Sequence, residues 1–219
     1  MADRTFFSFL LDRTGSMSSV RDATISAFNE FVAHQVSLEG ATAWTLTIFD
    51  SESIDVLYRE LAGADVPKLT PETYLPRANT PLFDAIGSQA KLARETVEAD
   101  GAYDAKVFVI QTDGEENASK EYRIDDVRSL VKALEDEGWQ IIYLGAGIDA
   151  YQAGTFIGAS QFVATSYIAD DVSTQAAFAA ASGATFAFRR TGRTQSVTQK
   201  VAGDDVQTNA NDPMLKLKR

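Results

Sequence analysis

Five oxygen-bearing side chains stand where predicted strands end or where a predicted helix begins. Asp12, Thr14 and Ser16 occupy alternate positions directly after an apolar run. Thr80 comes just before the start of a predicted helix, and Asp113 follows a second apolar run. Carboxylate and hydroxyl oxygens, without histidine or thiol, suit hard divalent cations and not zinc or copper. The set therefore predicts a Mg²⁺ site, with Mn²⁺ or Ca²⁺ as alternatives.

The spacing of the first three residues supports a shared site. If the backbone stays extended, alternate residues point to the same side, so 12, 14 and 16 can converge. Gly15 would permit the tight turn that this requires. Helix capping is the competing explanation, because Ser, Thr and Asp are ordinary N-cap residues. Capping explains each residue singly, whereas the combination favours a metal.

The elements that must position these residues follow from hydrophobic periodicity. Short apolar or alternating runs predict strands, and apolar residues spaced three or four apart predict helices. The expected strands are 5–11, 43–49, 53–60, 105–111, 139–144 and 161–165. The expected helices are 20–38, 81–99, 122–137, 149–157 and 171–188.

This order predicts an α/β fold with a doubly wound, mainly parallel sheet. One antiparallel edge strand is expected from the hairpin formed by 43–49 and 53–60, and helices should cover both faces. Ligands of such sheets bind beyond the carboxyl ends of the strands, which is where the five residues stand.

Two parts of the chain are predicted. Residues 1–190 form one domain, and residues 191–219 are polar and aperiodic, which predicts a tail that is flexible or ordered only by a partner. The basic end of this tail, Lys216, Lys218 and Arg219, contrasts with an acidic body.

Composition excludes several classes of site and partner. The 219 residues include no cysteine, which rules out disulfides, thiolate zinc sites and cysteine nucleophiles, and the single histidine, His34, cannot complete a Ser-His-Asp triad. A net charge of −11 argues against nucleic-acid binding. No targeting or membrane segment is recognisable. A cytoplasmic protein is expected, either free or assembled into a larger particle.

Three segments resemble the metal-site segments of von Willebrand factor A domains of the bacterial and phage type. They are D-R-T-G-S-M (12–17), N-T-P-L-F-D-A-I (79–86) and T-D-G (112–114). Thr14 stands where the family pattern D-x-S-x-S has its middle serine, which keeps a hydroxyl. The resemblance covers roughly residues 1–190.

The resemblance implies a metal-ion-dependent adhesion site. The hydroxyls of Thr14, Ser16 and Thr80 would coordinate Mg²⁺ directly, and Asp12 and Asp113 directly or through water. An open coordination position would then accept an Asp or Glu carboxylate from a protein partner. The implied activity is binding and not catalysis, and the oligomeric state is left open.

Two other functions are compatible with parts of the sequence. A structural or assembly subunit would dock through residues 191–219. A Mg²⁺-dependent phosphoryl-transfer enzyme on a similar sheet would need an acid–base carboxylate two residues after Asp12, where Thr14 stands instead.

Four polar residues near the predicted ligands have open roles. Arg77 and Asn79 either line a ligand groove or belong to an ordinary polar loop. Glu115 and Glu116 either tune the cation and its partners or form a solvated loop.

Overall fold

The apolar run near the start of the chain becomes a central strand. In the computed structural model, which describes residues 1–101, 103–202 and 205–210, β1 (Arg4–Asp12) is buried at every position after Arg4. Such a strand has almost no alternation because both faces of the sheet around it are covered. It pairs in parallel with β2 (Ala41–Phe49) on one side and β4 (Ala105–Thr112) on the other.

The described strands form one sheet in the order β3-β2-β1-β4-β5-β6-β7-β8. The other strands are β3 (Ile54–Ala62), β5 (Gln140–Ala146), β6 (Phe162–Tyr167), β7 (Val197–Ala202) and β8 (Asp205–Ala210). The pairings from β2 to β7 are parallel. β3 is antiparallel at one edge, as predicted from the hairpin, and β8 is antiparallel to β7 at the other. The predicted fold class is confirmed.

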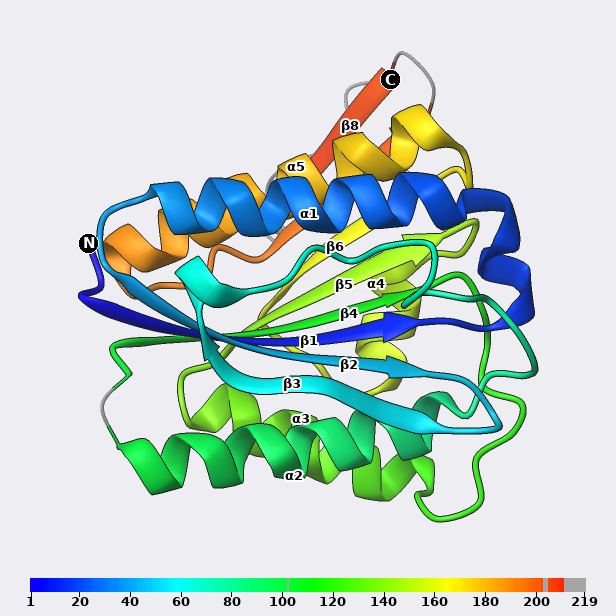
Figure 1. Ribbon diagram of the computed structural model, residues 1–219, viewed down its shortest axis with the longest axis horizontal. Helices are drawn as coiled ribbons and strands as arrows, with labels where there is room; N and C mark the ends of the chain where they lie inside the picture. The colour runs from blue at the N-terminus through cyan, green and yellow to red at the C-terminus, as the bar shows by residue number, and fades with distance from the viewer. Residues whose placement is uncertain (102, 203–204, 211–219) are drawn as a thin grey trace.

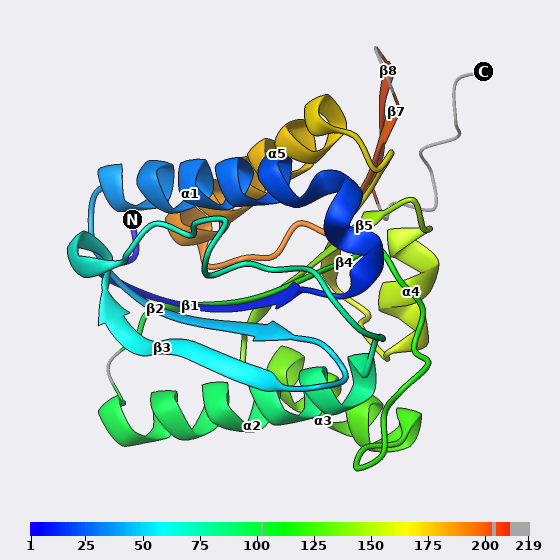
Figure 2. The ribbon, with the colours of Figure 1, turned by 45° about the vertical axis from the view of Figure 1, so that its right-hand side comes forward.

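Helices lie on both faces of this sheet (Figures 1 and 2). One face carries α1 (Arg21–Ser37) and α5 (Asp171–Thr191), which pack against each other. The opposite face carries α2 (Leu82–Asp100), α3 (Ile124–Asp136) and α4 (Ala150–Phe156). Each layer buries its own hydrophobic cluster, so the sheet separates two cores.

The end of the chain differs from the predicted tail. Val197–Ala202 forms β7 and pairs in parallel with β6, and Asp205–Ala210 folds back on it as β8. The side chain of Val201 is buried in the core beneath α1 and α5. The sheet therefore continues past the boundary expected at residue 190. The basic residues Lys216, Lys218 and Arg219 lie outside the described residues.

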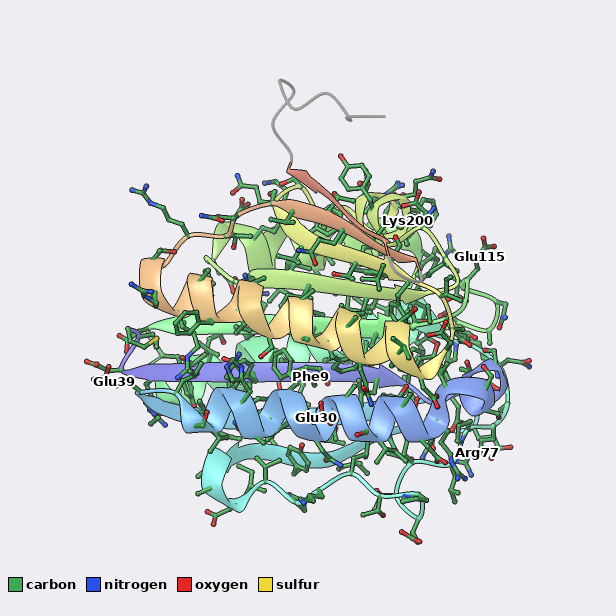
Figure 3. The ribbon with its side chains drawn as sticks, turned by 90° about the horizontal axis from the view of Figure 1, so that it is seen from above. Phe9, Glu30, Glu39, Arg77, Glu115 and Lys200 are labelled. Atoms are coloured by element: carbon green, nitrogen blue, oxygen red, sulfur yellow. The ribbon has the colours of Figure 1, made fainter. Side chains whose placement is uncertain are left out.

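The two central strands lead to opposite faces. The chain leaves β1 for α1 on one face and leaves β4 for α3 on the other. This reversal makes the carboxyl ends of the two strands the switch point of the sheet, where ligands of doubly wound sheets bind. Figure 3 shows the labelled residues Arg77 and Glu115 at this end of the sheet and Glu39 at the other.

Within the described residues, no helix combines the length and the apolar character needed to cross a membrane.

Candidate metal centre

Asp12 lies at the switch point of the sheet. It is the last residue of β1 and is fully buried. One carboxylate oxygen, Oδ1, accepts a 2.7 Å hydrogen bond from the backbone N–H of Thr14. The other, Oδ2, accepts a 2.5 Å hydrogen bond from the hydroxyl of Thr112, the last residue of β4. The orientation of this carboxylate is therefore fixed by its own loop and by the neighbouring strand.

A chain of hydroxyls connects the first loop to the third. The Thr14 and Ser16 hydroxyl oxygens lie 3.2 Å apart, and the Ser16 hydroxyl donates to Asp113 Oδ1 at 2.7 Å. Thr14 has the extended backbone expected at this position, and a 3₁₀ helix over Gly15–Val20 follows it. Asp12, Thr14, Ser16 and Asp113 are thus joined through hydrogen bonds, as their predicted convergence requires.

Thr80 approaches this group from the loop that precedes α2. A side-chain carbon added at Gly114 would lie 3.2 Å from the Thr80 hydroxyl, so this hydroxyl packs against the backbone next to Asp113. Asn117 fixes the position, because its side-chain oxygen accepts from the Thr80 N–H and its own N–H donates to the Thr80 carbonyl. Asn117 could not be recognised from sequence, because an exposed loop asparagine has no distinctive pattern.

A buried ion-pair network, formed by Arg13, Asp50 and Arg77, holds two of these loops together. Arg13 and Arg77 both donate to Asp50 Oδ2, through their Nε atoms at 2.8 and 2.9 Å. The side chain of Asp50 is completely buried and that of Arg13 nearly so. The backbone N–H of Gly15 donates to the Ala78 carbonyl, and that of Arg77 donates to the Arg13 carbonyl, so main-chain hydrogen bonds join the same two loops. Sequence analysis left Arg77 either as a residue of a ligand groove or as part of a polar loop. In the structure its side chain pairs with Asp50 and supports the loop.

The loop after Asp113 is braced against α2 by two carboxylates. Glu116 accepts from the backbone N–H groups of Ala118, Ser119 and Phe83. Asp84, in the first turn of α2, accepts from three successive backbone N–H groups, those of residues 120–122. Glu116 is thus a structural residue of the loop, and Asp84 has a role that its position in a helical pattern did not suggest.

Both acidic residues of the centre are shifted toward the protonated form. Burial raises the pKa of Asp12 to about 6, although hydrogen bonds from Thr112 and Thr14 oppose the shift. Burial also raises the pKa of Asp113. No Lys or Arg of the described chain forms an ion pair with either carboxylate, because Arg13 is directed toward Asp50. A cation bound between Asp12 and Asp113 would favour the charged form of both carboxylates and lower their pKa values.

The five side chains fit a hard divalent cation. They offer only oxygen atoms, two carboxylates among them, and the described residues contain no group of three or more His, Cys, Asp or Glu side chains arranged to hold a metal. Mg²⁺ keeps several of its water ligands in proteins. A site with two carboxylates and three hydroxyls therefore suits it better than a cage of carboxylates. The residues that could hold it are Asp12, Thr14, Ser16, Thr80 and Asp113.

Solved structures with a similar architecture include von Willebrand factor A domains. A von Willebrand factor type A protein from Catenulispora acidiphila is 15% identical at a TM-score of 0.59, over 83% of this chain and 42% of its own. Proximal thread matrix protein 1 from the mussel byssus is 14% identical at 0.59, over 95% and 48%. Manganese-loaded TRAP protein from Plasmodium vivax is 16% identical at 0.54, over 80% and 70%.

These similarities establish the fold. The chain has the fold of von Willebrand factor A domains, and it spans less than half the length of the first two proteins named. No protein-family model matches the sequence, and no curated protein matches it either.

Proposed function

We propose that the chain is a protein-binding module that recognises an Asp or Glu carboxylate of its partner through a divalent cation, with Mg²⁺ the preferred ion. The observation that carries this proposal is the convergence of Asp12, Thr14, Ser16, Thr80 and Asp113 at the carboxyl ends of β1 and β4. Further support comes from the similar fold of the TRAP protein, whose structure is manganese-loaded.

The residues of the centre would contribute two kinds of oxygen ligand to the ion. Asp12 and Asp113 supply negative charge, and the hydroxyls of Thr14, Ser16 and Thr80 supply neutral oxygens. Bound Mg²⁺ would add a positive charge with a coordination position open to a foreign carboxylate. A partner's carboxylate would bind the ion at this position in place of a water molecule.

The scaffold supports binding without turnover. Thr112, Asn117 and the network of Arg13, Asp50 and Arg77 hold the loops before any ligand arrives, which lowers the ordering cost of binding. Thr14 stands where a phosphoryl-transfer enzyme on this type of sheet would need an acid–base carboxylate, and a hydroxyl does not perform that role near neutral pH.

Titration calorimetry with Mn²⁺ and Mg²⁺ tests the centre directly. Asp113→Ala should weaken ion binding at least about tenfold, because changes even to residues behind the ligands cost that much. Asp125→Ala is the matched control, since Asp125 is a highly exposed acid on α3, and it should bind the ion as the parent does. Equal affinities for parent and Asp113→Ala would refute the metal centre.

The partner is tested by capture from the native host lysate, in Mg²⁺ and in EDTA, with identification by mass spectrometry. A protein retained only in Mg²⁺ and lost with Asp113→Ala supports recognition through the ion. Capture that persists in EDTA would instead favour assembly through another surface, and deletion of residues 211–219 would then test the tail.

A further inference from the structure

A groove opens directly beside the proposed metal centre. It is a cavity of about 640 Å³ between the start of α2, the loop after β4, and α4. Gly114 lines it and also contacts the Thr80 hydroxyl, so the cavity begins where the ligand set ends. A peptide that placed a carboxylate at the centre would therefore bring its neighbouring side chains to this groove.

The walls of the groove are apolar and partly aromatic. Phe83 and Phe156 face each other with ring centroids 6.3 Å apart, and Ile148 lies on the same lining. The side chain of Phe156 is 53% exposed. An exposed phenylalanine in a concave site is a common feature of interaction surfaces. Such walls would pack against the aliphatic part of a partner's side chain.

The charged residues of the lining are all acidic. They are Glu115, Glu116 and Asp149, and no Lys, Arg or His among the described residues lines the groove with them. Glu116 and Asp149 are already bonded to backbone N–H groups, at the loop and at the start of α4. Glu115 is exposed and has no hydrogen bond or ion pair within the described chain. The groove thus favours a cation and offers it one uncommitted carboxylate.

The Phe156 ring of the groove wall already contacts one cation of the chain, the guanidinium group of Arg128. The guanidinium carbon of Arg128 lies 5.3 Å from the centroid of the Phe156 ring, and Arg128 Nε donates to the Phe156 carbonyl. The ring of Phe83 carries no such cation in the described structure. Aromatic faces attract Lys and Arg by their negative potential.

From these features we infer that the groove receives a Lys or Arg side chain of the partner, close in sequence to the carboxylate bound at the centre. Its aliphatic stem packs against Phe83, Phe156 and Ile148, and its cationic head pairs with Glu115. This inference rests on the proposed function, and it narrows the partner to a segment that carries an acidic and a basic residue together.

A peptide library with one fixed Asp and randomised flanking positions is the probe. The full chain is immobilised, peptides are bound in Mg²⁺ and released with EDTA, and the released sequences are counted. Lys and Arg should be enriched at one flanking position. For the best peptide, replacing that residue by norleucine, which keeps the stem and removes the charge, should weaken binding about twofold to fivefold, the range of an exposed ion pair.

Variants of the groove assign the effect to Glu115. Glu115→Gln should cause the same loss for the basic peptide and none for the norleucine peptide, and Glu115→Lys should remove the basic preference from the selection. Glu121→Gln, an exposed glutamate further along the same loop and outside the lining, is the control. Phe156→Ala should weaken both peptides because it removes part of the wall.

The outcomes separate the two proposals. Release of peptides by EDTA with acidic, purely apolar or no flanking preference overturns the groove inference and leaves the metal centre standing. A basic preference that is unchanged in Glu115→Gln also overturns it. If EDTA releases no peptide and calorimetry shows no ion binding, the proposed function fails and the groove inference falls with it.

Discussion

Asp12 is an ionisable residue at a position that burial makes unfavourable for charge. Its carboxylate is inaccessible to solvent and its pKa is raised to about 6. In the unfolded chain the carboxyl returns to its ordinary value of 3.8. Between these two values the folded protein holds a proton that the unfolded chain has lost, so stability rises as pH falls from about 6 to 3.8. Above about pH 6 the destabilisation is complete.

The first prediction concerns this pH dependence. In EDTA, lowering the pH from 7 to 5 should raise the free energy of unfolding, and Asp12→Asn should stabilise the protein at pH 7. The upper limit is about 3 kcal/mol, from a shift of about two pKa units. Urea denaturation at several pH values measures both effects. Mg²⁺ at pH 7 should stabilise the parent and not the variant.

Two results would contradict this account of Asp12. One is a parent protein whose stability in EDTA is independent of pH between 4 and 6. The other is an Asp12→Asn variant that is less stable than the parent at pH 7 without metal, which would mean that the hydrogen bonds from Thr14 and Thr112 outweigh the cost of the buried charge.

The positions of the candidate ligands could be predicted from sequence because their pattern is local. Asp12, Thr14 and Ser16 are consecutive alternate residues, and Asp113 directly follows a recognisable strand. The partner of Arg13 could not be predicted, because Asp50 is 37 positions away and only the pairing of β1 with β2 brings the two together.

At the scale of elements, the network around Asp50 joins the β2–β3 hairpin to the two loops that carry Thr14 and Thr80. Asp50→Asn should destabilise the protein by about 1–3 kcal/mol, because it removes the buried carboxylate that Arg13 and Arg77 share and leaves Arg13 paired with the partly exposed Asp55. It should also weaken Mn²⁺ binding about tenfold, as loss of support behind metal ligands does. Chemical denaturation and calorimetry measure the two effects.

The neighbouring Glu52 provides the control. It pairs with Arg77 at 3.1 Å from an exposed position, so Glu52→Gln should change stability by less than about 1 kcal/mol. Similar losses in Asp50→Asn and Glu52→Gln would show that burial of the network does not matter.

Two helix glycines should respond to the same substitution with opposite sign. A side-chain carbon at Gly87 in α2 would lie 2.4 Å from the Tyr122 ring, whereas one at Gly183 in α5 would meet nothing within 4 Å. Gly87→Ala should destabilise by about 1–3 kcal/mol through overpacking. Gly183→Ala should stabilise by about 0.5–1 kcal/mol, because alanine favours the helix. Thermal unfolding compares them, and destabilisation by Gly183→Ala would contradict the open space found there.

The helices were predictable from apolar residues three or four positions apart, and the buried strands from short apolar or alternating runs. β7 and β8 were not, because an edge pair has little apolar surface to display, and only three of the six residues of Val197–Ala202 are apolar. What places β7 in the sheet is its pairing with β6 and the burial of Val201, and both depend on the rest of the fold.

At the scale of the whole molecule, the sheet leads to a prediction about where the domain ends. A chain that ends at residue 195 should be less stable than one that ends at residue 210, because it lacks the β6–β7 pairing and the burial of Val201. Burial of a valine side chain alone contributes about 1.5 kcal/mol or more. Urea denaturation of the two truncated chains measures the difference, and equal stabilities would restore the boundary near residue 190.

The sheet also divides the two tryptophans of the chain between its faces. Trp44 stacks on Phe7 at 4.0 Å in the layer under α1 and α5, and Trp139 lies edge-on to Phe6 and Phe108 in the layer under α2, α3 and α4. Each side of the molecule thus contains its own intrinsic fluorophore. With one indole replaced by phenylalanine, the emission of the other reports on a single layer, and events on the two sides can be followed separately in time.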